Sequence, residues 1–228
     1  MVIEPKHKGR LVFADFDIDD AEELIDWSTF QDEQSARTLI QEIKKGRKLT
    51  LQGVVAIERA KRSGDDIIVT TTKRREVKLP LANREVASMV ASKGDYICCY
   101  ALSAGVGLDK LCEETDLETK GLYEQIATVL CGAFVERIHS FVRRQMWGYE
   151  KVKALSTNDI LLHNFQGARF EVGSSELPSP QLRSDIFSLM GVEMTTYIKL
   201  DDDYNITPKG SACGIILSKS VKVKKEIE

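Results

Sequence analysis

The sequence lacks the features that mark membrane-spanning and disulfide-rich proteins. No apolar run approaches the roughly 18 residues that a membrane-spanning helix needs, and the opening stretch MVIEPKHKGR has no apolar core of a secretory signal. The five cysteines form no C-x-x-C pair. Two of them, Cys98 and Cys99, lie in an apolar run of the kind that often buries free thiols. We therefore expect a cytoplasmic protein with reduced cysteines.

Positive charge and metal ligands are also scarce. The formal net charge of −3 gives no basic footprint for nucleic acid, and His7, His139 and His163 are too scattered to suggest a metal site. The catalytic motifs G-x-S-x-G, H-E-x-x-H, the P-loop and the Rossmann G-x-G-x-x-G are absent. So is D-x-H-x-x-G, the motif of corrinoid proteins that ligate cobalt through histidine. We expect no nucleic-acid partner, no membrane contact and no resident metal.

The chain does have an ordinary globular composition, with 43% hydrophobic and 29% charged residues. Its periodicity predicts, in chain order, strand 11–13, helices 17–25 and 32–45, a hairpin of 51–57 with 67–72, helix 80–92, strand 95–102, helix 117–147, helix 180–190, and strands 193–200 and 212–217. This order predicts a mixed sheet with helices packed on it. We expect a single domain over residues 1–228, with a helical N-terminal subregion at 1–48 and a flexible tail at 221–228.

The longest periodic segment, 117–147, carries apolar residues at steps of three and four. This spacing predicts an amphipathic helix whose apolar stripe covers the sheet. Farther on, Ser156 and Asp159 have the S-x-x-D form of a capping box, which predicts a helical turn over 160–163. The segment 117–147 is therefore expected to be the central structural helix.

The stretch 164–178, NFQGARFEVGSSELP, places one arginine between two glycines and links two helical patterns. Glycine permits close backbone approach and positive φ angles, and the guanidinium fork matches a carboxylate in geometry. Arg169 is therefore a candidate clamp for a small anionic group. The alternative interpretation is a surface loop with a solvated arginine.

Six stretches in a fixed order resemble one known family. They are IDWSTF at 25–30, GVVAI with GDDII at 53–57 and 64–68, DYI at 95–97, the stretch 134–149 that ends in WGY, NFQGAR at 164–169, and PKGSACG at 208–214. Their order and spacing resemble the activation domain of cobalamin-dependent methionine synthase, the module that binds S-adenosylmethionine. Each motif alone is weak, and the ordered set, which spans nearly the whole chain, carries the resemblance.

The resemblance implies an α+β fold, namely a C-shaped single domain with a twisted, mainly antiparallel sheet flanked by helices. It also implies a role in methionine biosynthesis, the reductive reactivation of a methyltransferase whose corrinoid has been oxidised to inactive cobalt(II). S-adenosylmethionine is then the methyl donor to cob(I)alamin carried by a partner protein, and a flavodoxin-like protein donates the electron. Because cobalt(I) is a strong nucleophile and the sulfonium methyl is already activated, such a site needs to position its ligands and needs no acid–base residues.

The resemblance further implies which residues bind S-adenosylmethionine. Asp26 stands where the family has the aspartate that contacts the positively charged end of the ligand. Arg169 stands at the arginine of the R-x-x-x-G-Y motif, which holds the ligand near its carboxylate, and Gly173 keeps the motif's glycine. Backbone groups from Phe170 through Glu171 to Gly173 would supply further polar contacts. Asp26 and Arg169 are expected to face each other across one cleft.

The chain also departs from the family pattern. Ser174 replaces the tyrosine that follows the motif's glycine, and Gly132 replaces an acid on the long helix, where Glu136 lies one turn on and can substitute. His163 replaces a second acid, and 211–217 lacks the aromatic residues that pack beside the ligand in the family. Lost contacts of these kinds weaken cation binding by about 1–3 kcal/mol each.

Three hypotheses follow from this pattern. Because the chain begins and ends near the edges of the domain, we expect it to act in trans, on a cobalamin-binding methionine synthase or related corrinoid protein, as one component of that methyltransferase system. The lost tyrosine and acids favour an alternative, a module of the same fold that docks on or caps a corrinoid protein without using S-adenosylmethionine. A third possibility is that the cleft holds another small anion on Arg169.

Overall fold

The computed structural model describes residues 2–113, 115–150, 156, 158–159, 162 and 164–219. Its centre is a seven-stranded sheet. Six of the strands follow the order β4-β3-β2-β5-β9-β6, and the seventh, β1, pairs with β2. Every pairing is antiparallel, including that of the small second sheet, β7 with β8. The strands are β1 Gly9–Phe16, β2 Thr50–Ser63, β3 Asp66–Thr70, β4 Glu76–Leu79, β5 Asp95–Val106, β6 Ala168–Glu171, β7 Lys199–Leu200, β8 Ile206–Thr207 and β9 Ser211–Leu217. The expected antiparallel sheet flanked by helices is confirmed.

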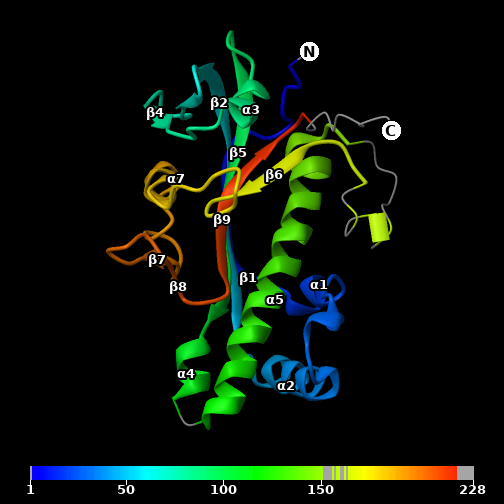
Figure 1. The fold of residues 1–228 in the computed structure, drawn as a ribbon. Helices are drawn as coiled ribbons and strands as arrows, with labels where there is room; N and C mark the ends of the chain where they lie inside the picture. The colour runs from blue at the N-terminus through cyan, green and yellow to red at the C-terminus, as the bar shows by residue number, and fades with distance from the viewer. Residues whose placement is uncertain are drawn as a thin grey trace, which may run out of the picture.

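Helices pack on both faces of the sheet. The helices are α1 Ile18–Glu22, the 3-10 helix η1 Trp27–Thr29, α2 Glu33–Gly46, α3 Arg84–Ser88, α4 Leu108–Cys112, α5 Leu117–Phe141, the π-helical η2 Val142–Trp147, and α7 Leu182–Met190. Figure 1 shows α5 running along one side of the strands with α1 and α2 beyond it, while α7 and the β7–β8 hairpin lie on the other side. The sheet therefore separates two hydrophobic cores, one under α5 and one under α7.

The two cores arise because successive strand residues point to opposite sides of the sheet. In the central strand β5, Tyr100 and Leu102 are buried in the core under α5, whereas Cys99 and Ala101 are buried in the core under α7. Because both faces of β5 are covered, its residues are almost all apolar and do not alternate with polar ones.

The long helix has the expected amphipathic character and is in addition covered on a second side near its C-terminal end. α5 packs on β5 and β9, and its outer side is covered by α1, η1 and α2. The Arg137 guanidinium donates to the Asp20 carbonyl at 2.7 Å, and the Gln125 amide donates to the Thr29 carbonyl at 3.0 Å. The predicted apolar stripe, from Leu122 to Val142, is buried or half-buried in the core that α5 shares with the sheet, and an exposed face remains at Gly121, Gln125, Thr128 and Gly132. Only residues 133–140 are buried on all sides. The predicted stripe and the central position of the helix are confirmed.

Local capping chemistry sets several helix ends. Asp32 and Asp116 accept backbone N–H groups at the starts of α2 and α5, and Gly191 ends α7 in the left-handed conformation with φ 61°. α2 runs one residue past the predicted helix 32–45, through Gly46, because Arg47 takes the left-handed position that ends the helix, with φ 46°.

Two predicted elements are shorter than expected. The segment 80–92 holds only α3, which begins after Asn83 accepts the Val86 N–H at 3.1 Å. The segment 193–200 holds only β7, because the Val192 carbonyl accepts hydrogen bonds from the backbone of Thr195 and Thr196 in tight turns.

Some predictions fall beyond the described residues. Ser156 and Asp159 exchange the hydrogen bonds of the predicted capping box. Residues 160, 161 and 163 of the predicted turn, and the predicted tail at 221–228, lie outside the part of the chain that the structure describes. The single domain with its 1–48 subregion stays a prediction.

Candidate functional site

The glycine-flanked arginine lies on β6, the edge strand of the sheet. Arg169 lies opposite Ile216 of β9, and Glu171 lies opposite Gly214, which is itself opposite Tyr100 of β5. Because Tyr100 and Ile216 belong to the core under α5, Arg169 and Glu171 project from that side of the sheet. Among the described strands, β6 has a neighbour on one side only, β9, so the backbone groups on its other edge are candidate contacts for a ligand.

Arg169 forms an ion pair with Glu136 of α5. Nη2 of the guanidinium lies 2.5 Å from Oε1 of the carboxylate, and the two side chains are 19% and 12% exposed. Within the described residues, Nη1 of Arg169 and Oε2 of Glu136 are buried without a hydrogen-bond partner. Leaving such a group unpaired costs about 1–3 kcal/mol. The pair is thus half satisfied, with one donor for an anion and one acceptor for a cation.

Tyr100, Glu171 and Cys131 lie close enough to interact electrostatically with Arg169 or with one another. Burial raises the pKa of Tyr100 well above its usual value, and the buried hydroxyl has no hydrogen-bond partner among the described residues. Burial also raises the pKa of Glu171, while the charges of Arg169 and Arg183 oppose this shift. Burial raises the pKa of Cys131 to about 12. The ion pair therefore stands beside a neutral phenol and a neutral thiol.

Gly173 and Arg183 shape the turn that follows β6. Gly173 has φ 104°, and a side-chain carbon built there would lie 2.9 Å from Nη2 of Arg183. The Arg183 guanidinium donates to the Val172 carbonyl at 3.1 Å and to the Tyr204 carbonyl at 3.0 Å, which ties the turn to the loop before β8. The backbone angle favours glycine at position 173, and a Cβ there would also displace the end of the Arg183 side chain.

Two of the predicted site residues direct their side chains away from the ion pair. The Ser174 hydroxyl accepts the Leu177 N–H at 3.4 Å and so closes its own turn. The Phe170 ring is 8% exposed and packs in the core under α7. Only the backbone of Phe170 can therefore contact a ligand held by Arg169, which is the contribution the sequence predicts for it.

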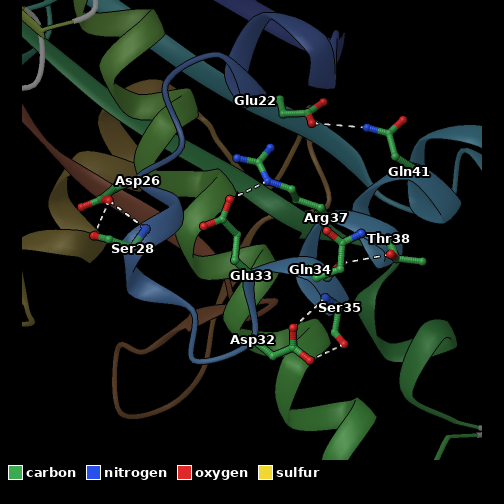
Figure 2. A network of polar contacts seen from close by, with 10 residues as sticks. All are labelled: Glu22, Asp26, Ser28, Asp32, Glu33, Gln34, Ser35, Arg37, Thr38 and Gln41. Carbon is green, nitrogen blue, oxygen red and sulfur yellow. Dashed lines mark hydrogen bonds and ion pairs between the residues drawn. The ribbon is translucent and has the colours of Figure 1, made fainter.

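Asp26 lies at the corner between α1 and η1, where it caps η1. Its Oδ1 accepts both the N–H of Ser28 at 3.1 Å and the Ser28 hydroxyl at 2.6 Å. Figure 2 shows this contact at the exposed corner that leads into α2. Both hydrogen bonds end on Oδ1, and no described residue bonds to Oδ2, which can therefore accept from a cationic group.

One face of α5 connects the Asp26 corner with the Arg169 ion pair. Gln125, Gly132 and Glu136 share this face through their spacing of seven and four residues. Gln125 holds the η1 turn through Thr29, and Glu136 holds Arg169, so the two contacts are about 16 Å apart along the helix axis. Gly132 between them is exposed, and no atom lies within 4 Å of the place where its Cβ would be.

The structure therefore brings together only some of the predicted site residues. Arg169 and Glu136 touch, Glu171 is on the same side of β6, and Gly173 forms the adjoining turn. Asp26 has no contact with Arg169 in the described structure and instead bonds within its own turn. The contacts that fix the two groups lie about 16 Å apart along α5, and the expectation that Asp26 and Arg169 face each other across one ligand cleft stays a prediction.

Sequence reasoning missed three residues that shape the site, namely Tyr100, Arg183 and Gly214. A Cβ at Gly214 would lie 2.2 Å from the Phe170 carbonyl oxygen and 2.7 Å from the Tyr100 hydroxyl, so the glycine lets β6 and Tyr100 approach. The apolar run DYICCYAL contains no signal that singles out Tyr100. Arg183 lies within an ordinary helical pattern, so its contact with the turn depends on tertiary structure alone.

The arrangement is suited to binding a small charged molecule. No group of histidine, cysteine or acidic residues that could hold a metal ion occurs in the described part of the chain. Among the same residues, no helix combines the length and the apolar character needed to cross a membrane. Since burial raises the pKa of Cys131 and of Cys213, neither thiol is set up as a nucleophile. The charged groups of Arg169, Glu136 and Glu171 dominate the site.

Comparison with known proteins agrees with the sequence motifs and the fold. The family model described as "Vitamin B12 dependent methionine synthase, activation domain" matches residues 28–223. Among solved structures, the MetH reactivation domain bound to AdoHcy (S-adenosylhomocysteine) is similar, with a TM-score of 0.84 and 23% identity over 96% of this chain and 81% of that one. The chain belongs to the family of activation domains of vitamin B12-dependent methionine synthases.

Proposed function

We propose that this protein binds S-adenosylmethionine at the Arg169–Glu136 pair and presents it as methyl donor during the reductive reactivation of a corrinoid methyltransferase. Family membership supports the reactivation role, and the related structure contains AdoHcy, the demethylated form of the same ligand. The observation that carries the proposal is the half-satisfied ion pair, whose free nitrogen and free oxygen are both buried.

The amino-acid end of S-adenosylmethionine is a zwitterion, and its charges complement this pair. The ligand carboxylate accepts from Nη1 of Arg169, and the ligand ammonium donates to Oε2 of Glu136, so that both buried orphan atoms gain partners. These hydrogen bonds are charge-assisted and partly shielded from water, since the two side chains are 19% and 12% exposed. The backbone at the outer edge of β6 supplies additional polar contacts.

The sulfonium and the nucleoside part then extend along α5. Glu171 adds a carboxylate on the same side of β6 as Arg169, where it favours a positively charged sulfur. Gly132 leaves open space beside the helix, and Asp26, with its open Oδ2, lies toward the far end of this face. In this arrangement Asp26 and Arg169 contact different ends of the ligand, and Asp26 does not take part in binding the ligand carboxylate.

The chemistry requires positioning more than acid–base catalysis. When the partner is bound, its corrinoid supplies the cobalt(I) nucleophile, and this chain holds the activated methyl group in place. The partner is a cobalamin-binding methionine synthase or a related corrinoid protein, with a flavodoxin-like electron donor. Action in trans is part of this proposal, and reconstitution from separate proteins tests it.

Isothermal titration calorimetry with S-adenosylmethionine and AdoHcy tests ligand binding. We expect binding to the unmodified protein and a loss of affinity of at least about 10-fold in Arg169→Gln, because a charge-assisted hydrogen bond contributes about 1.5–3 kcal/mol. Arg137→Gln is the matched control, since Arg137 neighbours Glu136 on α5 but pairs with Glu23. Absence of heat and of thermal stabilisation at millimolar ligand would remove the methyl-donor role.

A docking or capping module that does not use S-adenosylmethionine is the second candidate. The β9 residues on the α5 side, Ala212, Gly214 and Ile216, offer no aromatic ring for the adenine or sulfonium, and the Ser174 hydroxyl is engaged in its own turn. Mixing the protein with a separate cob(II)alamin-loaded methionine synthase, a reductant and S-adenosylmethionine distinguishes the two. Methylcobalamin formation, seen by absorbance, supports reactivation in trans, whereas complex formation without methylation supports the docking module.

A further inference from the structure

A concavity lies away from the Arg169 site. It has a volume of about 980 Å³ and is lined by residues from the end of α2, α4, α5 and the β7–β8 hairpin, with neither Arg169 nor Glu136 among them. Figure 1 shows α4 and the β7–β8 hairpin on the same side of the long strands. A groove of this size can enclose a nucleotide-sized molecule.

The groove is strongly positive. Arg47, Lys48, Lys110 and Lys199 line it together with a single acid, Asp109. None of these four cations takes part in an ion pair within the described residues, whose salt bridges use other lysines and arginines. In a chain whose net charge is −3, unpaired cations concentrated in one concavity attract a multiply charged anion.

Backbone contacts fix the chain that carries three of these cations. Arg47 is the left-handed residue that ends α2, where the Lys48 N–H donates to the Ile43 carbonyl at 3.1 Å. Gly107 packs so closely on this corner that a Cβ there would lie 2.4 Å from the Lys48 carbonyl oxygen, and Lys110 follows on α4 one turn later. The backbone positions from which Arg47, Lys48 and Lys110 extend into the groove are therefore set before any ligand arrives.

The opposite wall adds a lysine and an exposed aromatic ring. Lys199 of β7 pairs in register with Thr207 of β8, and both line the groove. Tyr197 lines it as well and is 71% exposed, while its backbone N–H donates to Gln52 of β2 at 3.1 Å. A fixed tyrosine with an open ring face offers a stacking surface for a planar group.

We propose that this groove binds a phosphate-bearing, nucleotide-sized ligand, with its phosphates on Arg47, Lys48, Lys110 and Lys199 and its planar ring on Tyr197. The combination of several converging cations with one accessible aromatic ring favours a nucleotide over an acidic protein surface, because the charges line a concavity and the ring stands at its wall. This site is independent of S-adenosylmethionine, which carries no phosphate.

Calorimetric titration of the full chain with ATP, inorganic pyrophosphate and adenosine tests the proposal. We expect ATP to bind most tightly, pyrophosphate more weakly and adenosine weakest, with ATP binding reduced by added salt. Lys110→Ala and Lys199→Ala should each lower ATP affinity by about 3- to 5-fold, and Tyr197→Ala should lower the affinity for ATP but not for pyrophosphate. Lys45→Ala is the matched control, since Lys45 is an exposed lysine of α2 outside the groove.

The Arg169→Gln variant separates this site from the S-adenosylmethionine site, because it should retain full ATP affinity. The proposal is overturned if none of the three probes binds at millimolar concentration in low salt, or if the groove variants leave ATP binding unchanged. It is also overturned if a poly-glutamate peptide binds the groove in a Lys110-dependent manner while ATP does not, since the surface then serves an acidic protein.

Discussion

Arg169 and Glu136 share one hydrogen bond, 2.5 Å long between Nη2 and Oε1, and each keeps a second buried polar atom without a partner. A buried ion pair built for stability alone would normally satisfy its remaining donors and acceptors. The unsatisfied atoms here, with opposite charge preferences, match the carboxylate and ammonium of an amino acid. The pair links β6 to α5, so a ligand bound to it would contact both elements.

Glu136→Gln tests the contact with the ligand ammonium separately from the contact between Arg169 and the ligand carboxylate. The glutamine oxygen still accepts from Arg169, but the carboxylate that pairs with the ligand ammonium is lost. We expect the affinity for S-adenosylmethionine to fall by about 10-fold or more, while the affinity for a deaminated analogue that keeps the carboxylate changes little. Calorimetry with both ligands measures this. Equal losses for the two ligands would contradict an ammonium contact.

Tyr100→Phe tests whether the buried hydroxyl serves the ligand or the fold. The hydroxyl is buried without a partner among the described residues, so its removal should leave the free energy of unfolding unchanged or raise it by up to about 1 kcal/mol. If the hydroxyl contacts the ligand, S-adenosylmethionine binding weakens several-fold in the same variant. Urea denaturation and calorimetry give the two values. A clear loss of stability would mean that the hydroxyl supports the fold instead.

Gly173→Ala should destabilise the turn after β6. The residue has φ 104°, and the new Cβ would lie 2.9 Å from Nη2 of Arg183, so we expect a loss of about 1–3 kcal/mol. Gly121→Ala is the control, because Gly121 lies in α5 with no atom within 4 Å of its Cβ position. That change should stabilise the protein by up to about 1 kcal/mol. Denaturation midpoints that move equally in both variants would refute the strain argument.

Glu58→Gln should make stability less dependent on pH. Glu58 is 7% exposed on β2, and burial raises its pKa while a backbone hydrogen bond from Thr72 partly opposes the shift. Because the folded state holds this proton more tightly than the unfolded state, stability is lost as pH rises from the unfolded pKa through the folded one. The glutamine variant should exceed the parent by on the order of 1 kcal/mol at neutral pH, and the two should converge below about pH 4. Parallel curves across this range would show that Glu58 is not responsible.

The sequence was sufficient for elements with strong local signals. The β2–β3 hairpin, α2 and α7 follow from alternation, apolar spacing and end signals such as Asp32 and Gly191. Those signals act over a few residues, so they survive without knowledge of the rest of the fold. The family resemblance added the antiparallel sheet and the importance of Arg169, which local patterns alone leave as a possible surface residue.

The missed features depend on contacts between distant segments. The burial of α5 on all sides at residues 133–140 could not be predicted, because it depends on α1 packing on the side that a lone helix on a sheet would expose to water. The hydroxyl of Tyr100 and the guanidinium of Arg183 become part of the site only when β5, β6 and α7 are assembled. Asp26 was expected to face Arg169 across one cleft, and the spacing of about 16 Å along α5 between their contacts could not be read from the sequence.

A crystal structure of the AdoHcy complex tests the central claim most directly. The account predicts that the carboxylate of the ligand lies within hydrogen-bonding distance of Nη1 of Arg169, that its ammonium lies within the same distance of Oε2 of Glu136, and that the nucleoside follows α5 past Gly132. A ligand bound elsewhere, with the Arg169–Glu136 pair unchanged and its two orphan atoms still unpaired, would contradict it.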